Sequence, residues 1–126
     1  MVYLGKGVDI LRLDNDLVRT ILLQIEKDVD GIINYEVKSY CEHQFPEYPC
    51  EQTVYHMKYL IDAHFLQAAN GYFRDITPIG RDFLNNIRND GVWSDTKKII
   101  KPLGSVAINV VSEVAASIVK KTLNLP

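Results

Sequence analysis

Four side chains of the types that bind zinc fall within one stretch of the chain: Cys41, His43, Cys50 and His56. Their spacing matches no standard structural zinc site, in which closely spaced Cys and His pairs hold the ion tetrahedrally. Cys50 and His56 would also lie at different places around a helix, because six residues are not a whole number of turns. We therefore interpret the four as scattered residues and expect no metal site.

Nucleophilic catalysis is not indicated either. Neither cysteine has a recognisable set of catalytic partners close by in the sequence, and no Gly-x-Ser-x-Gly turn or phosphate-binding loop occurs. The two neighbouring carboxylates Asp28 and Asp30 fall at an expected helix end, where solvated acids are ordinary. We expect no catalytic residue, no cofactor and no enzymatic activity.

Nucleic-acid binding is the remaining candidate chemistry, and it depends on a helix expected over residues 51–63. Glutamine can pair with an adenine edge, lysine with guanine or phosphate, and tyrosine hydroxyls with phosphate oxygens. Glu51 and Asp62 on the same helix oppose phosphate, so both double-stranded DNA and another protein remain open as partners. The candidate contacts are Gln52, Tyr55, Lys58, Tyr59, Arg74, Lys97, Lys98 and Lys101.

A hairpin is predicted next to that helix. Asn70-Gly71 favours a two-residue type I′ turn, because this pair tolerates the positive φ that both central positions require. Such a turn pairs Ala69 with Tyr72, Ala68 with Phe73, Gln67 with Arg74, and Leu66 with Asp75.

Helices are predicted on both sides of the hairpin. Asp14 is a good cap for a first helix, and Thr77 followed by Pro78 opens a later one, which should stop near Asp90-Gly91. Between them, residues 33–40 alternate as a strand does, and two prolines leave at most one helical turn in residues 41–50. The apolar stripes are Leu17, Val18, Ile21, Leu22 and Ile25, then Val54, Met57, Leu60 and Ile61, then Ile79, Phe83, Leu84 and Ile87.

The C-terminal helix, expected from Val106 to Thr122 with Ser105 as its cap, is apolar around most of its circumference. A helix of this kind must be buried on more than one side, either against its own chain or against a second copy. We prefer self-association to form a homo-oligomer. The residues expected to mediate it are Val106, Val110, Val114 and Ile118.

Charge is distributed unevenly. The residues before Arg74 include 6 basic and 11 acidic side chains, a balance of −5, whereas those from Arg74 onward include 8 and 5, a balance of +3. A polyanion should therefore meet the C-terminal half. The sequence shows no signal peptide and no apolar run of about 20 residues, so we expect a cytoplasmic protein with reduced cysteines and no membrane association.

Four stretches of the sequence, at residues 14–28, 54–66, 75–98 and 104–123, resemble a family of small, uncharacterised phage and prophage proteins with a winged-helix-like N-terminal part. In addition, ITPIG-x-x-FL (76–84) resembles the strand-to-helix junction of many winged-helix regulators. The family usually has glycine where this chain has His64, so we expect this histidine to adopt a positive φ. The resemblance implies a fold and a phage association, and no catalytic residue.

The predicted fold is mainly α (α+β). It consists of an N-terminal arm (1–13), a winged-helix domain with a small hairpin wing (14–90), and a C-terminal helical tail (91–126) that packs on this domain or on a second copy. The predicted function is that of a phage- or prophage-derived, helix-turn-helix-like binding protein, a small DNA-binding regulator. The alternative is a protein-interaction module that uses the same scaffold without binding DNA.

Overall fold

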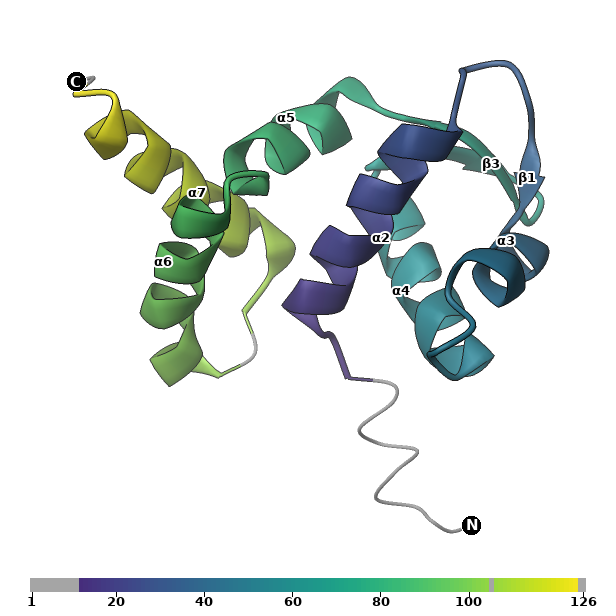
Figure 1. Ribbon diagram of the computed structural model, residues 1–126, viewed down its shortest axis with the longest axis horizontal. Helices are drawn as coiled ribbons and strands as arrows, with labels where there is room; N and C mark the ends of the chain where they lie inside the picture. Colours follow the sequence, from purple (N-terminus) through teal and green to yellow (C-terminus); the bar gives the residue numbers. More distant parts are fainter. Residues whose placement is uncertain (1–11, 105, 125–126) are drawn as a thin grey trace, which may run out of the picture. The chain divides into compact units, whose positions relative to one another are not determined.

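The computed structural model describes residues 12–104 and 106–124. The fold is mainly helical with one small antiparallel sheet, as predicted (Figure 1). The chain divides into two compact units, one ending at Gly80 and the other beginning at Arg81. This boundary lies inside helix α5 (Pro78–Ile87). Most of the expected N-terminal arm and the expected cap Ser105 fall outside the described residues.

The first unit begins with helix α2 (Asn15–Asp28), which forms as predicted. The Asp14 side chain accepts a hydrogen bond from the Leu17 N–H (3.2 Å), which satisfies one of the free donors of the first turn. The helix packs against α4 (Cys50–Asp62) and the sheet, and its whole predicted stripe is buried. The stripe consists of Leu17, Val18, Ile21, Leu22 and Ile25.

The strand predicted over residues 33–40 is largely wrong. Only β1 (Tyr35–Glu36) is extended, and helix α3 (Val37–Gln44) follows at once. The Val37 N–H donates to the Gly71 carbonyl oxygen (2.9 Å) instead of continuing a strand ladder. The buried residues Val37, Tyr40 and Cys41 are spaced as one face of a helix, so the same apolar side chains reach the core from a helix.

An aromatic cluster fixes α3 against the sheet. The Tyr40 ring lies edge-on to the Phe73 ring, with centroids 4.9 Å apart, and Tyr35 stacks on Phe73 at 5.5 Å. The Tyr40 hydroxyl donates to Asp28 Oδ2 (2.8 Å), while the Tyr35 hydroxyl donates to the Asp28 carbonyl oxygen (3.0 Å). Burial, assisted by the bond to Asp28, raises the pKa of Tyr40. The start of α3 is therefore held in one position.

Helix α4 forms as predicted but buries a different set of residues. Met57 and Leu60 are buried, whereas Val54 and Ile61 are only half-buried. His56 is fully buried instead. Its Nε2 accepts a hydrogen bond from the Asp14 N–H (2.8 Å), and its Nδ1 lies 2.8 Å from the Gln52 carbonyl oxygen. Because Nε2 accepts, the ring is a neutral tautomer with its proton on Nδ1.

A Schellman motif ends α4. The His64 N–H donates to the Ile61 carbonyl oxygen (3.0 Å) and the Phe65 N–H to the Leu60 carbonyl oxygen (2.9 Å). This motif requires a left-handed residue, and His64 has φ 63°, as predicted.

The hairpin of β2 (Leu66–Ala69) and β3 (Tyr72–Ile76) turns at Asn70-Gly71, where φ is 54° and 82°. The pairs Ala69–Tyr72 and Ala68–Phe73 are confirmed, but the two outer pairs were predicted wrongly. A β-bulge leaves Arg74 unpaired, and this extra residue lets both Phe73 and Ile76 face the core. The observed outer pairs are Gln67–Asp75 and Leu66–Ile76, and the sheet order is β1-β3-β2.

Helix α5 begins as predicted. Thr77 Oγ1 accepts a hydrogen bond from the Gly80 N–H (3.1 Å), and the Thr77 hydroxyl donates to the His64 carbonyl oxygen (2.6 Å). A Cβ at Gly80 would collide with the Phe65 carbonyl oxygen, so only glycine allows this close approach. The inward position predicted for Ile79 is wrong, because its side chain is 61% exposed.

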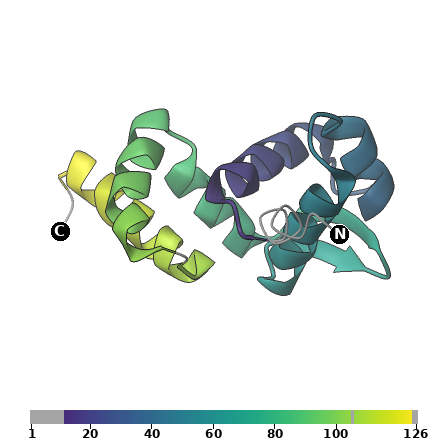
Figure 2. The same cartoon turned by 90° about the horizontal axis from the view of Figure 1, so that it is seen from below.

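In the second unit, α6 (Asp90–Ile100), the short helix η1 (Lys101–Leu103) and α7 (Ile108–Thr122) follow α5. Helix α5 ends at Ile87, close to the predicted stop, and Asp90-Gly91 begins the next helix, because the Asn89 side chain accepts from the Val92 N–H (3.0 Å) and caps α6. Helices α6 and α7 lie side by side in both views (Figure 1 and Figure 2). The buried residues of α7 are Ile108, Val111 and Ala115.

Candidate functional site

Helix α4 presents one ridge to solvent. Glu51 and Lys58 are exposed, and Val54 lies half-buried between them. Steps of three and four residues place all three on one side of the helix. The opposite side is buried through Thr53, His56, Met57 and Leu60.

A groove of about 460 Å³ lies between this ridge, the start of α3 and the hairpin turn. We call it the α3–α4 groove. The hydrogen bond from Val37 to Gly71 joins two of its three walls, so the groove is a built feature of the first unit. Its lining residues are Glu36, Val37, Lys38, Cys50, Glu51, Val54, Lys58, Asn70, Gly71 and Tyr72.

The charges of the groove balance. One wall carries glutamate, valine and lysine at positions 36–38, and the α4 ridge carries the same three residue types at Glu51, Val54 and Lys58. The ring of Tyr72, which is 46% exposed, adds apolar surface. A phosphate backbone would meet two carboxylates here, whereas a protein segment would meet apolar surface with both signs of charge beside it.

Only one predicted nucleic-acid contact, Lys58, lines the groove. Tyr55 and Tyr59 are half-buried, as is Gln52, whose carbonyl oxygen is bonded to His56. Arg74 is exposed at the bulge, and it lines a separate hollow with Asn34, Gln67, Ala68, Ala69 and Tyr72.

The predicted basic residues of α6 and η1 belong to the second unit. Lys98 and Lys101 are exposed, and Lys97 is half-buried with its Nζ 5.8 Å from the centre of the Trp93 ring. That distance allows a cation–π contact. The described part of the first unit has 6 basic and 11 acidic side chains, and that of the second has 7 and 4. The balances are therefore −5 and +3.

The four candidate zinc ligands do not form a cluster. Among the described residues, no group of three His, Cys, Asp or Glu side chains is placed to hold a metal ion. Cys41 is buried, and burial raises the pKa of its thiol to about 11, against a smaller lowering by a hydrogen bond with Thr53. Cys50 is half-buried at the groove. In the same part of the chain, no helix has the length and apolar character needed to span a bilayer.

The groove residues other than Lys58 were not recognised from the sequence as one site. Residues 36–38 were assigned to a strand, in which neighbouring side chains alternate between faces. The repeated order of glutamate, valine and lysine was the available signal. It becomes meaningful only when α3 replaces the predicted strand.

Comparison with known proteins places the chain in a family. A family model matches residues 12–107, which is most of the chain. The chain belongs to this family, described as "Hypothetical protein (DUF2513)". The chain is also similar to an "Uncharacterized protein" of Haemophilus influenzae, with 28% identity over 117 residues that cover 86% of this chain and 95% of the relative. No solved structure matches significantly.

Helix α7 follows the last residue of the DUF2513 match. All four residues predicted to mediate self-association are half-buried: Val106, Val110, Val114 and Ile118. The contact with α6 uses the neighbouring face of Ile108, Val111 and Ala115. Helix α7 therefore keeps a partly exposed apolar flank.

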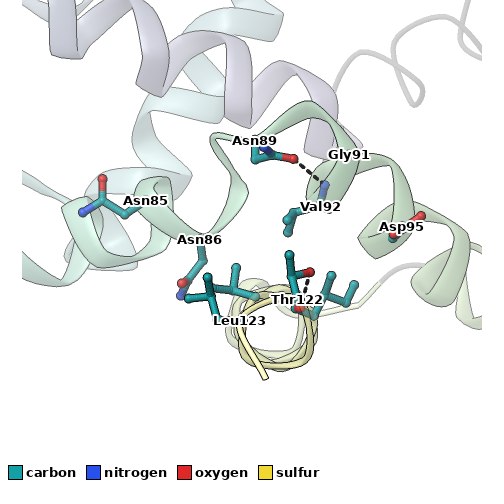
Figure 3. A pocket seen from close by; sticks show the side chains of 10 residues that line it. Asn85, Asn86, Asn89, Gly91, Val92, Asp95, Thr122 and Leu123 are labelled. Atoms are coloured by element: carbon teal, nitrogen blue, oxygen red, sulfur yellow. Dashed lines mark hydrogen bonds between the residues drawn. The ribbon is translucent and has the colours of Figure 1, made fainter. Parts of the chain in front are cut away.

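A second hollow, of about 410 Å³, lies among α5, α6 and α7 (Figure 3). Several of its polar groups are already bonded within the unit. The Asn89 oxygen caps α6, and the Thr122 hydroxyl donates to the Ile118 carbonyl oxygen (2.9 Å). Asn85 Oδ1 accepts from Arg88 (2.9 Å).

Proposed function

We propose that this chain is a phage- or prophage-derived winged-helix protein that acts by binding another protein, without catalysis. The α3–α4 groove is the contact surface. The observation that carries the proposal is its composition: an apolar surface with two glutamates and two lysines beside it. The four sequence stretches that resemble phage and prophage proteins support the origin.

The element order supports the winged-helix assignment. Helix α2, strand β1, helices α3 and α4 and the hairpin follow one another, and β3 pairs with both other strands. Helices α3 and α4 pack together across a short connection, as in a helix-turn-helix. The wing in this proposal is the β2–β3 hairpin.

Electrostatics favour a protein over DNA as the partner. The exposed side chains of α4 are Glu51, Lys58 and Asp62, a balance of −1. Together with the balance of −5 for the first unit, this opposes the approach of a phosphate backbone. A protein surface with both signs of charge has no such penalty.

Photo-crosslinking in living cells tests the proposal. A photoreactive amino acid replaces Lys58, and in a matched control it replaces Thr20, which is exposed on α2. We expect a protein adduct at position 58, its loss when Val54→Asp is added, and no equivalent adduct at position 20. An adduct that is insensitive to Val54→Asp, or equal adducts at both positions, would contradict a specific groove contact.

A DNA-binding regulator is the second candidate. Two exposed cations of the first unit, Lys58 and Arg74, and the balance of +3 in the second unit favour it. On this hypothesis, Lys58→Ala and Arg74→Ala each weaken binding to random duplex DNA and reduce the slope of affinity against salt by roughly one. Fluorescence anisotropy at several salt concentrations measures both. No binding of the parent chain at low salt would remove this candidate.

A further inference from the structure

We propose that the α3–α4 groove of one chain receives α7 of a second copy. This inference rests on the proposed function, because it names the protein that the groove binds. Each copy gives its α7 to the other, so the dimer contains the same contact twice.

Helix α7 has one partly exposed flank. Ile108, Val111 and Ala115 are buried, whereas Val110 and Val114 keep part of their surface accessible. At 100° per residue, Val110, Val114 and Lys121 lie within roughly 40° of one another around the helix. Glu113, which is exposed, borders the same flank. The flank thus combines two valines with the exposed Ser117, and it has an acid at its border and a base near its end.

The charged residues of α4 and α7 have similar spacings. Glu51 and Lys58 are seven residues apart on α4, which is about 10.5 Å along a helix, and Glu113 and Lys121 are about 12 Å apart on α7. In an antiparallel arrangement, Lys58 lies opposite Glu113 and Glu51 opposite Lys121. The half-buried Val54 then lies at the level of Ser117 and Ile118, between the two charge pairs.

The net charges of the two units have opposite signs. Insertion of α7 into the groove brings the unit with a balance of +3 to the unit with a balance of −5 on the other copy. Pairing α7 with α7 would instead bring two positive units together. Long-range electrostatics therefore favour the groove as the partner surface of α7.

Oligomeric state is the first test. We expect the full chain to sediment as a dimer, with an association weakened by salt. Val54→Asp in the groove and Val110→Asp on α7 should each raise the dimer dissociation constant by roughly tenfold or more, because each places an unpaired charge in the contact. Thr20→Asp, at an exposed position of α2 away from the groove, should leave the constant unchanged.

Charge reversal is the second test, and it remains decisive if an aspartate variant does not fold. Lys58→Glu and Glu113→Lys should each weaken the dimer by roughly two- to fivefold, and mixing the two reversals in one chain should restore it. A parent chain that stays monomeric overturns the inference, as does a double reversal no better than the worse single one. A dimer broken by Val110→Asp but not by Val54→Asp or Lys58→Glu also overturns it. With any of these outcomes, a different protein that crosslinks at position 58 would still support the proposed function.

Discussion

Buried polar residues hold helices of the first unit together through hydrogen bonds. The imidazole of His56 links the start of α2 to the middle of α4, because its two nitrogens serve the Asp14 N–H and the Gln52 carbonyl oxygen. A buried donor or acceptor that loses its partner costs about 1–3 kcal/mol. His56 therefore keeps the unexposed side of α4 in register while the opposite ridge forms the groove.

The first prediction at the residue scale concerns Cys41. Its pKa of about 11 leaves roughly one thiol in a thousand ionised at pH 8, so Cys41 should react slowly with a disulfide reagent at that pH and faster as the pH approaches 11. Thiol titration of Cys50→Ser and Cys41→Ser variants separates the two sites. Equal rates for both variants at pH 8 would show that Cys41 is accessible and ordinary.

The second prediction concerns Gly80. Replacing Gly80 with alanine should lower the free energy of unfolding by about 3 kcal/mol, because the added methyl group collides with the Phe65 backbone and the Ile76 side chain. Urea denaturation measures the change. Ser94→Ala, at an exposed helical position, is the control and should change stability by less than about 0.5 kcal/mol. A Gly80→Ala variant as stable as the parent would refute the close approach.

Elements set by local chemistry were predictable from the sequence. The cap at Asp14, the Asn70-Gly71 turn and the Thr77-Pro78 helix start all depend on residues within one turn of each other. The helix in residues 33–44 was missed, because Ile33, Tyr35 and Val37 alternate as in a half-buried strand and precede the helical spacing of the later residues. Their helical state depends on the aromatic contacts with distant Phe73.

The bulge and the groove also depend on distant contacts. Arg74 has no partner residue on β2 because both Phe73 and Ile76 point into the core. No residue near the turn indicates this arrangement from the sequence. The groove takes its walls from α3, α4 and the hairpin turn, so its composition appears only after these segments have packed. By contrast, the exposed position of Lys58 followed from helical periodicity alone.

The prediction at the element scale concerns the end of α4. His64→Gly should raise the free energy of unfolding by about 0.5–1 kcal/mol, because glycine adopts the observed φ of 63° without a side-chain clash. Chemical denaturation measures this small gain. Ala63→Gly is the matched control, since Ala63 has φ −78° and should lose stability instead. A loss in both variants would mean that the histidine is not strained.

At the scale of the whole molecule, the two units have net charges of opposite sign, and this asymmetry was already visible in the sequence. How this charge asymmetry contributes to binding was harder to predict. The residues predicted to contact DNA do not belong to one unit. Lys58 lies in the first unit and Lys97 in the second. The sequence also did not identify the partner of α7. An apolar helix must be buried, but its sequence does not show which surface buries it.

The continuity of α5 across the unit boundary has a thermodynamic consequence. Its cap, Thr77, belongs to the first unit, whereas the residues after Gly80 belong to the second. Helix formation is cooperative, so a weakened first turn also lowers the stability of the turns that follow it. Thr77→Ala should cost about 1 kcal/mol and speed amide hydrogen exchange near Ile87 as well as near Gly80. Exchange accelerated only before residue 81 would show two independent folding units; acceleration along the whole helix would mean that a mutation in either half is felt in both.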